Sequence, residues 1–342
     1  MSCAKKIKLD EKILPILADD LLEDTPLVEV FVDSIKDQKT ISKVVKDLNA
    51  SCPIPELTHL KRIKAKEILL LIKNNLEKQQ VHEYLKSNGF NVSLLCNQIR
   101  IVSVAKIAPK TKTQHAKVNQ LWPCNFHSDK YIEKLSTNTL FDHSEILEHQ
   151  LYMKVAIEVA RYSKQNKIAH FSKGVVIVDP KIKSIVALGY SVTHENPCKH
   201  APMIAIDNVA KTQNGGAWNN YEQLTTTKLN LCGIHPKLYT LLQEKFPQIT
   251  FGASRFKGKS IKEPSDGPYL CTGYCVYSTH EPCIMCAMAL VHSRVKRVFY
   301  GVKTNNGGLG TLCKVHTVKD LNHHYEVFTK LCQDECESLK DV

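Results

Sequence analysis

The 342-residue sequence contains no run of apolar residues long enough to span a lipid bilayer. Residues 1–14, MSCAKKIKLDEKIL, lack the apolar segment that a secretory signal needs. Acidic residues are also scarce, because 34 Asp and Glu accompany 46 Lys and Arg and leave a net charge of +12. We therefore expect no membrane association, and a positive charge of this size favours a polyanionic partner such as nucleic acid.

Thirteen cysteines are spread along the chain. Without a secretory signal we expect a reducing compartment, in which the thiols are free or bound to metal. The expected localisation is cytoplasm and nucleus. Lys5, Lys6 and Lys8 fit either a weak nuclear signal or a solvated terminus.

The length allows two domains, each with a core of its own. We predict an N-terminal α/β domain in residues 1–107, a linker in 108–142, and a second α/β domain in 143–342 with an inserted surface loop at 211–268. The segments of the first domain alternate as βαββαβ, which suggests a ferredoxin-like fold. In the second, the order helix, two strands, helix, strand, helix, strand indicates a three-layer α/β protein with a mixed central sheet.

Basic residues are concentrated between residues 58 and 117, where 12 Lys and Arg accompany 3 Glu. If residues 57–66 form a strand, alternation with period two places several of their cations on one face. Such a row fits an RNA backbone, but it also fits a solvated sheet edge that resists aggregation. The overall charge favours RNA. The residues predicted to bind it are Lys61, Arg62, Lys64 and Lys66.

The stretch THEPCIMCAMALVHS, residues 279–293, contains two cysteines separated by two residues, ahead of an apolar run that predicts a buried helix. Pro282 suits the first turn of this helix, because proline has no N–H to lose there. A helix N-terminus lowers the pKa of thiols and favours thiolates. Cys283 and Cys286 can therefore bind a soft cation such as zinc. A tetrahedral site needs more ligands, and the best candidate for the third is His200, which opens another predicted helix.

These motifs resemble a known enzyme family. The residues that carry the resemblance are His200, Glu281, Pro282, Cys283, Met285, Cys286, Ala287–Ser293 and Val298–Gly301. Through them, residues 145–332 resemble the cytidine deaminase-like fold and, more narrowly, the tRNA-specific adenosine deaminases. In that family a zinc ion activates water, and a Glu two residues after the histidine moves the proton. The resemblance implies Zn²⁺ as cofactor, with His200, Cys283 and Cys286 as its ligands.

Pro202 occupies the position at which the family has that glutamate. Proline has no titratable group, and losing a positioned acid or base lowers a rate by about 10²–10⁴-fold. Within the first helical turn, however, proline costs little stability. This exchange and the basic N-terminal domain resemble the non-catalytic subunit of the eukaryotic heterodimeric tRNA adenosine deaminases. The resemblance implies no catalytic residue in this chain, a catalytic deaminase subunit and tRNA as partners, and a role in converting the wobble adenosine-34 to inosine.

Two other functions stay open: a stand-alone active deaminase that recruits a different acid, and a zinc-stabilised RNA-binding module without a deaminase partner. Glu281 is not assigned as the base, because the family has a glutamate there beside its true base. Cys198, close to His200, is a rival ligand outside the motif. The C-terminal carboxylate near Asp341 and Val342 fits either a further zinc ligand or a disordered terminus.

Overall fold

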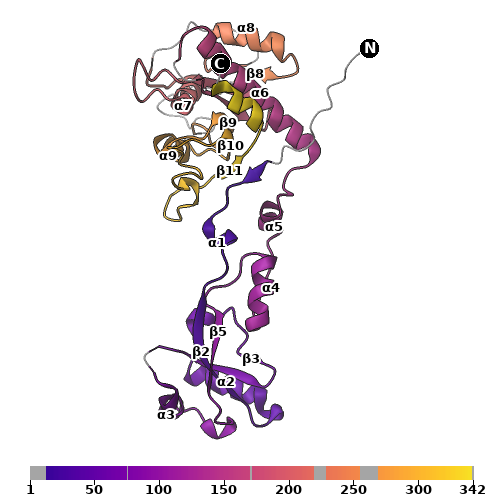
Figure 1. Cartoon of the computed structure of the whole chain (residues 1–342), viewed down its shortest axis with the longest axis vertical. Coiled ribbons are helices and arrows are strands. Elements are labelled where there is room, and N and C mark those ends of the chain that lie inside the picture. Colours follow the sequence, from indigo (N-terminus) through magenta and orange to yellow (C-terminus); the bar gives the residue numbers. More distant parts are fainter. Residues whose placement is uncertain (1–12, 75, 170–171, 219–228, 255–268, 341–342) are drawn as a thin grey trace, which may run out of the picture. The chain divides into compact units, whose positions relative to one another are not determined.

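The computed structural model describes residues 13–74, 76–169, 172–218, 229–254 and 269–340. The chain divides into two compact units (Figure 1). The C-terminal unit joins Met1–Ala18 to Phe141–Val342, and the N-terminal unit comprises Asp19–Leu140. In the described part of the chain, every helix is too short or too polar to cross a membrane.

The C-terminal unit is built on a seven-stranded sheet with the order β1-β11-β10-β9-β6-β7-β8. β10 pairs in parallel with both β9 and β11, and β7 with β8, whereas β6 is antiparallel to β7 and β9. The predicted mixed central sheet is thereby confirmed. The strands are β1 (Leu14–Pro15), β6 (Gly174–Asp179), β7 (Ser184–Tyr190), β8 (Thr250–Phe251), β9 (Cys275–His280), β10 (Arg297–Val302) and β11 (Glu326–Thr329).

Helices cover both faces of this sheet. Val175 and Ile177, which point to the same side of β6, lie in one core with residues of α7 and α9. On the other face α6 contributes His149, whose ring lies 4.3 Å from that of Phe299 between centroids. The predicted three-layer α/β architecture is confirmed. The helices are α6 (His143–Gln165), α7 (Ala201–Thr212), α8 (Pro236–Lys245), α9 (Ile284–His292) and α10 (Gln333–Glu337).

Two segments of the C-terminal unit differ from the predicted domain boundaries. β1 was expected in the N-terminal domain, but it pairs with β11 and places Leu14 opposite Thr329. This pairing joins distant parts of the chain, which no local pattern encodes. The predicted insertion at 211–268 contains α8, and β8 adds a strand to the sheet edge. Its stretches 219–228 and 255–268 lie outside the described residues.

The N-terminal unit contains a four-stranded antiparallel sheet with the order β3-β4-β2-β5. α2 and α3 bury their apolar positions, among them Leu48 and Leu85, in one core against this sheet. The predicted βαββαβ order is confirmed. Its elements are β2 (Leu27–Ser34), α2 (Ile41–Ser51), β3 (Ile63–Lys64), β4 (Glu67–Ile72), α3 (Val81–Ser87) and β5 (Arg100–Ala105), preceded by the short α1 (Asp19–Leu22).

The strand predicted at residues 57–66 is wrong in its extent. β3 covers only Ile63–Lys64, and a two-residue turn at Ala65 and Lys66 leads into β4. Ala65 has a φ of 55°, the left-handed conformation that tight hairpin turns require. The alternation of side chains therefore stops before Lys66, and the predicted single row of cations on a strand face does not form.

The linker predicted at residues 108–142 contains two helices, α4 (Lys112–Leu121) and α5 (Lys130–Ser136). Trp122, directly after α4, is 1% exposed and lies with Val118 in a core of the N-terminal unit. Its indole Nε1 donates a hydrogen bond of 2.6 Å to the Lys61 carbonyl oxygen. The linker prediction is thus wrong for α4, whose few apolar positions give too little periodicity to reveal a packed helix.

A capping box starts α4. Thr111 accepts a hydrogen bond from the Gln114 backbone N–H, and the Gln114 side chain accepts one from the Thr111 backbone. Thr111→Ala removes this cap and is expected to lower the free energy of unfolding by about 1 kcal/mol, as measured by urea denaturation. Thr113, exposed in the same helix, provides the control Thr113→Ala. Equal stability of the two variants would contradict a packed, capped α4.

Candidate metal centre

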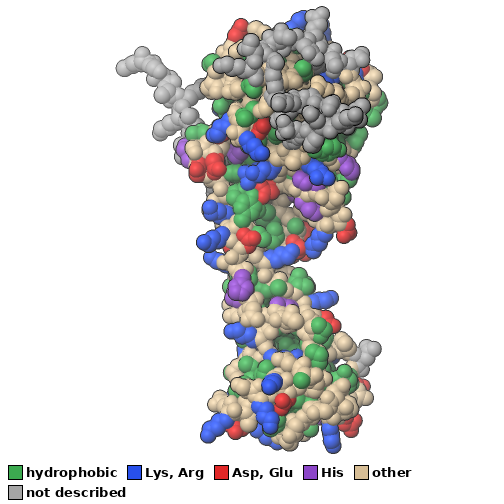
Figure 2. Space-filling model, turned by 180° about the vertical axis from the view of Figure 1, so that it is seen from behind, with side chains coloured by type: hydrophobic (Ala, Val, Ile, Leu, Met, Phe, Trp, Pro, Cys, Tyr) green, Lys and Arg blue, Asp and Glu red, His purple; other side chains and the backbone are tan. Residues whose placement is uncertain are grey.

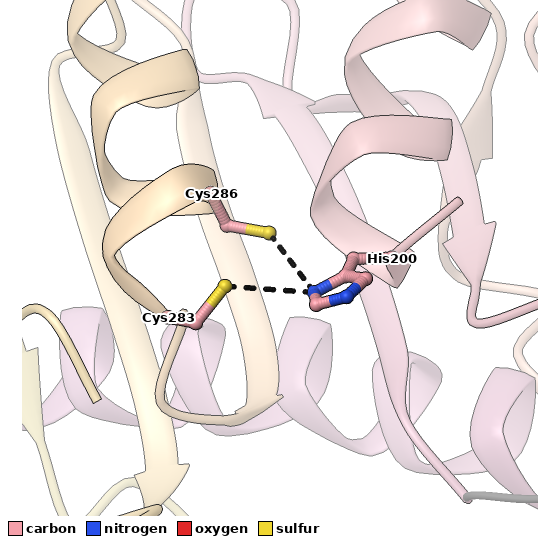
Figure 3. A group of neighbouring side chains, drawn as sticks. All are labelled: His200, Cys283 and Cys286. Atoms are coloured by element: carbon pink, nitrogen blue, oxygen red, sulfur yellow. Dashed lines mark hydrogen bonds between the residues drawn. The ribbon is translucent and has the colours of Figure 1, made fainter. Parts of the chain in front are cut away.

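Three predicted ligands come together in the C-terminal unit. The ligand atoms of His200, Cys283 and Cys286 all lie within 4.8 Å of one another. His200 Nδ1 is 3.5 Å from Cys283 Sγ and 3.6 Å from Cys286 Sγ (Figure 3). A tetrahedral zinc ion, with Zn–S bonds of about 2.3 Å and a Zn–N bond of about 2.1 Å, separates nitrogen from sulfur by about 3.6 Å. The three side chains therefore match the ligand spacing of a zinc site.

Two helix N-termini hold these ligands. His200 is the N-cap of α7, Cys283 is the N-cap of α9, and Cys286 lies in the first turn of α9. The dipoles of both helices place partial positive charge beside the thiols, which favours thiolates. Gly189 in β7 allows α7 to approach the sheet, because a Cβ there would lie 2.2 Å from the Ala201 carbonyl oxygen. This close packing fixes the start of α7 and with it the imidazole of His200.

The two thiols differ in acidity. Hydrogen bonding by Cys286, through its side chain and its backbone, together with the nearby His200, lowers the pKa of Cys283 to about 5 despite partial burial. This shift favours the thiolate form of Cys283 at neutral pH. The same pairing and burial raise the pKa of Cys286. A cation between the two sulfurs would favour the ionised form of both.

The cluster lines a cavity of about 670 Å³, within the ~300–1,000 Å³ range of small-ligand sites. Pro202 lies beside the ligands in its wall, as the second residue of α7, and is buried. The first turn of α7 is intact around it, since the Ile204 N–H donates to the His200 carbonyl oxygen over 3.0 Å. Proline thus preserves the helix start, while it offers no group that can carry a proton.

Glu281 supplies the one carboxylate among the described residues that line this cavity. Its side chain is tied to the loop at 304–311. Oε1 accepts hydrogen bonds of 3.0 Å from the backbone N–H groups of Leu309 and Thr311, and Oε2 accepts one of 2.5 Å from the Thr311 hydroxyl and one of 3.3 Å from the Thr304 N–H. A Cβ at Gly307 would lie 2.1 Å from the Glu281 carboxyl carbon. Glu281 therefore organises the loop packed against it, and sequence reasoning missed this role.

The other candidate ligands stand apart from the cluster. Cys198 is exposed and does not belong to the group of three that can hold a metal. Asp341 and Val342 lie outside the described residues.

Two of the four cations predicted to bind RNA are engaged within the chain. The Arg62 guanidinium donates to the carbonyl oxygens of Leu69, Cys52 and Leu70 over 2.7 to 2.9 Å. Lys64 Nζ donates to the Leu121 carbonyl oxygen, at the end of α4, over 2.7 Å. Lys61 and Lys66 are exposed. Nothing in the local sequence distinguishes these roles, because the carbonyl acceptors come from other segments.

Comparison with known proteins places these features in a family. Residues 147–302 match the cytidine and deoxycytidylate deaminase zinc-binding region, and residues 28–122 match the tRNA-specific adenosine deaminase TAD3 N-terminal domain. The second match extends from β2 through α4, consistent with α4 as part of the N-terminal unit. The cytidine deaminase-like fold predicted for the second domain is thereby confirmed.

Relatives align along both units. A zebrafish (Danio rerio) protein named probable inactive tRNA-specific adenosine deaminase-like protein 3 is 32% identical over 96% of this chain and 94% of its own. Arabidopsis thaliana tRNA-specific adenosine deaminase TAD3 is 26% identical over 91% of this chain and 92% of its own. The fission yeast (Schizosaccharomyces pombe) tRNA-specific adenosine deaminase subunit tad3 is 23% identical over 74% and 66%, respectively. On this evidence, the chain belongs to the family of tRNA-specific adenosine deaminase 3 (TAD3) proteins.

Proposed function

We propose that this chain is the zinc-binding, non-catalytic subunit of a heterodimeric tRNA adenosine deaminase that converts the wobble adenosine-34 to inosine. It contributes tRNA binding and structural support to a catalytic partner. The observation that carries the proposal is the pairing of a complete His200, Cys283 and Cys286 cluster with Pro202 in the same cavity wall. The names of the zebrafish and fission yeast relatives, "probable inactive" and "subunit", support the same conclusion.

Zinc is the metal that the donor set favours. One imidazole and two thiolates are typical zinc ligands, and the nitrogen–sulfur distances of 3.5 and 3.6 Å fit its bond lengths. In deaminases of this class the ion supplies a Lewis acid that activates water. In this chain Pro202 cannot move the proton, and Glu281, the one carboxylate among the described lining residues, is held by its loop. The three ligands therefore serve to tie the start of α7 to the start of α9.

Electrostatics supports tRNA as the polyanionic partner. The net charge is +12, and Figure 2 shows, on one face, Lys and Arg side chains spread over both units and more abundant than Asp and Glu. Charge of this distribution attracts a phosphate backbone without specifying sequence. Sequence-independent contacts by this chain would leave the choice of the reacting base to the catalytic partner.

The test compares the purified chain with the chain co-purified with a deaminase subunit that carries the H-x-E motif. Inosine at position 34 of tRNA is quantified by nuclease digestion and mass spectrometry. The complex is expected to form inosine, and the chain alone to be at least about 10²-fold slower, because it lacks a positioned acid or base.

Robust turnover by the chain alone, abolished by His200→Ala, would instead identify a stand-alone deaminase. Failure to co-purify with any H-x-E deaminase subunit, with tRNA binding retained, would identify an RNA-binding module. In either case the heterodimer proposal is overturned.

A further inference from the structure

The N-terminal unit contains a cavity of about 550 Å³. One wall is apolar and includes Leu57, Leu60 and Leu69, which also belong to the core. The polar residues that line the cavity are Asn49 of α2, Thr58, Lys61, Arg62 and Asn125. No described lining residue is acidic, and the neighbouring Glu56 is exposed and does not line it. The cavity thus combines an apolar surface, two carboxamides and two cations.

Arg62 is held rigidly in this wall. Its Nε and Nη2 donate to three carbonyl oxygens, and the two N–H groups of Nη1 have no acceptor among the described residues. Burial lowers the pKa of Arg62 to about 10, so that it stays a cation at neutral pH. In the described part of the chain, no carboxylate forms an ion pair with Arg62 or Lys61. A half-buried cation without a counter-charge is costly, and an anionic ligand relieves that cost.

We propose that this cavity binds one unstacked nucleotide of an RNA strand, with the base against the apolar wall and the phosphate at Arg62 and Lys61. Proteins that recognise single-stranded RNA splay bases out of the stack and contact their edges with polar side chains. Asn49 and Asn125 offer carboxamides for such an edge, and each presents both a donor and an acceptor. The volume suits a ligand of this size.

The inference rests on the proposed function, because it names a site at which the tRNA partner is bound. It also narrows the four cations predicted to bind RNA to the two that line this cavity. Lys64 is used at the end of α4, and Lys66 lies in the turn after β3. If the cavity binds a base, the affinity for tRNA should depend on the shape of the cavity as well as on charge. Surface cations alone would make the affinity depend on charge only.

Asn49→Trp tests the shape requirement. Asn49 is exposed on α2, so a tryptophan there can fill the cavity without a change of charge. In the full-length chain we expect the dissociation constant for tRNA to rise about tenfold, because the tryptophan excludes the base from the cavity and its contacts are lost. Ala50→Trp, at the adjacent exposed position that does not line the cavity, is the control and is expected to change it less than about twofold. Equal affinities of the two variants, at equal melting temperatures, would overturn the proposal.

Lys61→Glu tests the phosphate contact. It should weaken tRNA binding more than Lys86→Glu, an identical charge change at an exposed position on α3 that is not part of the cavity. Equal effects would show that only the net charge matters and would contradict a specific phosphate site.

In parallel, tRNA containing 4-thiouridine is photo-crosslinked to the chain. Crosslinked peptides from residues 45–62 that disappear in Asn49→Trp support the site, and crosslinks confined to other peptides contradict it.

Titration with free ligands distinguishes a nucleotide-binding site from a site that binds any anion. Adenosine 5′-monophosphate and inorganic phosphate are titrated into the full-length chain and into Asn49→Trp. Nucleotide binding that is stronger than phosphate binding and is lost in Asn49→Trp supports the proposal, whereas equal binding of both ligands would reduce the cavity to an anion site. Normal tRNA affinity of Asn49→Trp in an active complex with the partner overturns this inference and leaves the proposed function intact. An inactive wild-type complex overturns the proposed function whatever the cavity binds.

Discussion

Cys283→Ser is expected to lower the zinc content of the purified chain from about one ion per chain to near zero. A serine hydroxyl is a poor ligand for zinc, and the two remaining ligands do not hold the ion. Because His200 and the cysteines lie at the starts of α7 and α9, the loss of the ion also removes the link between these two helices. Zinc is measured by inductively coupled plasma mass spectrometry and stability by thermal unfolding, each with and without a chelator. The chelator should lower the melting temperature of the wild-type chain and leave that of the variant unchanged.

Cys198→Ser is the matched control for this result. Cys198 is exposed, lies two residues before His200 and stands outside the cluster, so its replacement should leave both zinc content and chelator sensitivity unchanged. Loss of zinc from Cys198→Ser but not from Cys283→Ser would show that the ligand set is wrong. Zinc-free wild-type protein with undiminished stability would show that the cluster does not need a metal.

Glu281→Ala is expected to lower the free energy of unfolding by about 3 kcal/mol, because several hydrogen-bond donors lose their acceptor at once. Glu281 is 3% exposed, and its oxygens accept hydrogen bonds from Thr304, Leu309 and Thr311. The alanine removes the acceptor of all these donors, and the N–H of the buried Leu309 in particular costs about 1–3 kcal/mol when it is left unsatisfied. Urea denaturation measures the change. Glu281→Gln should be intermediate, because it keeps one acceptor oxygen but turns an amide toward backbone N–H groups.

Gly307→Ala provides an independent check on this loop. The new Cβ would lie 2.1 Å from the Glu281 carboxyl carbon, so the single variant should also be destabilised. In the double variant with Glu281→Ala, the space that the carboxylate leaves can accept the methyl group. The double variant should therefore lose less free energy of unfolding than the sum of the losses in the two single variants. Strict additivity would indicate that Glu281 does not pack against the loop at all.

Local sequence was sufficient for the two cysteines of the metal cluster. Cys283 and Cys286 are three residues apart at the start of one helix, and Pro282 marks that start. Their proximity therefore follows from the helix geometry, without any long-range contact. His200 required the family resemblance, since α7 and α9 are far apart in the chain. The βαββαβ order was also predictable, because each of its elements carries its own apolar period.

Predictions failed where a segment's role depends on distant partners. Arg62 and Lys64 have the composition of surface cations, but carbonyl groups of other segments engage them. α4 has a polar sequence and becomes part of a core through Trp122. β1 adds to the sheet only because β11, from the other end of the chain, offers it an edge.

The sequence by itself determined which donor groups the candidate metal site offers and that the side chain at Pro202 has no titratable group. Ligand identity at Cys283, Cys286 and His200, and the absence of a proton carrier at Pro202, are properties of residues that hold in any fold that brings the metal ligands together. Only the tertiary structure decided which charges are available for binding. Glu281 holds a loop, and Arg62 forms part of a cavity wall. Hydrogen bonds to groups of other segments, together with burial from water, fix what a charged side chain can still contact.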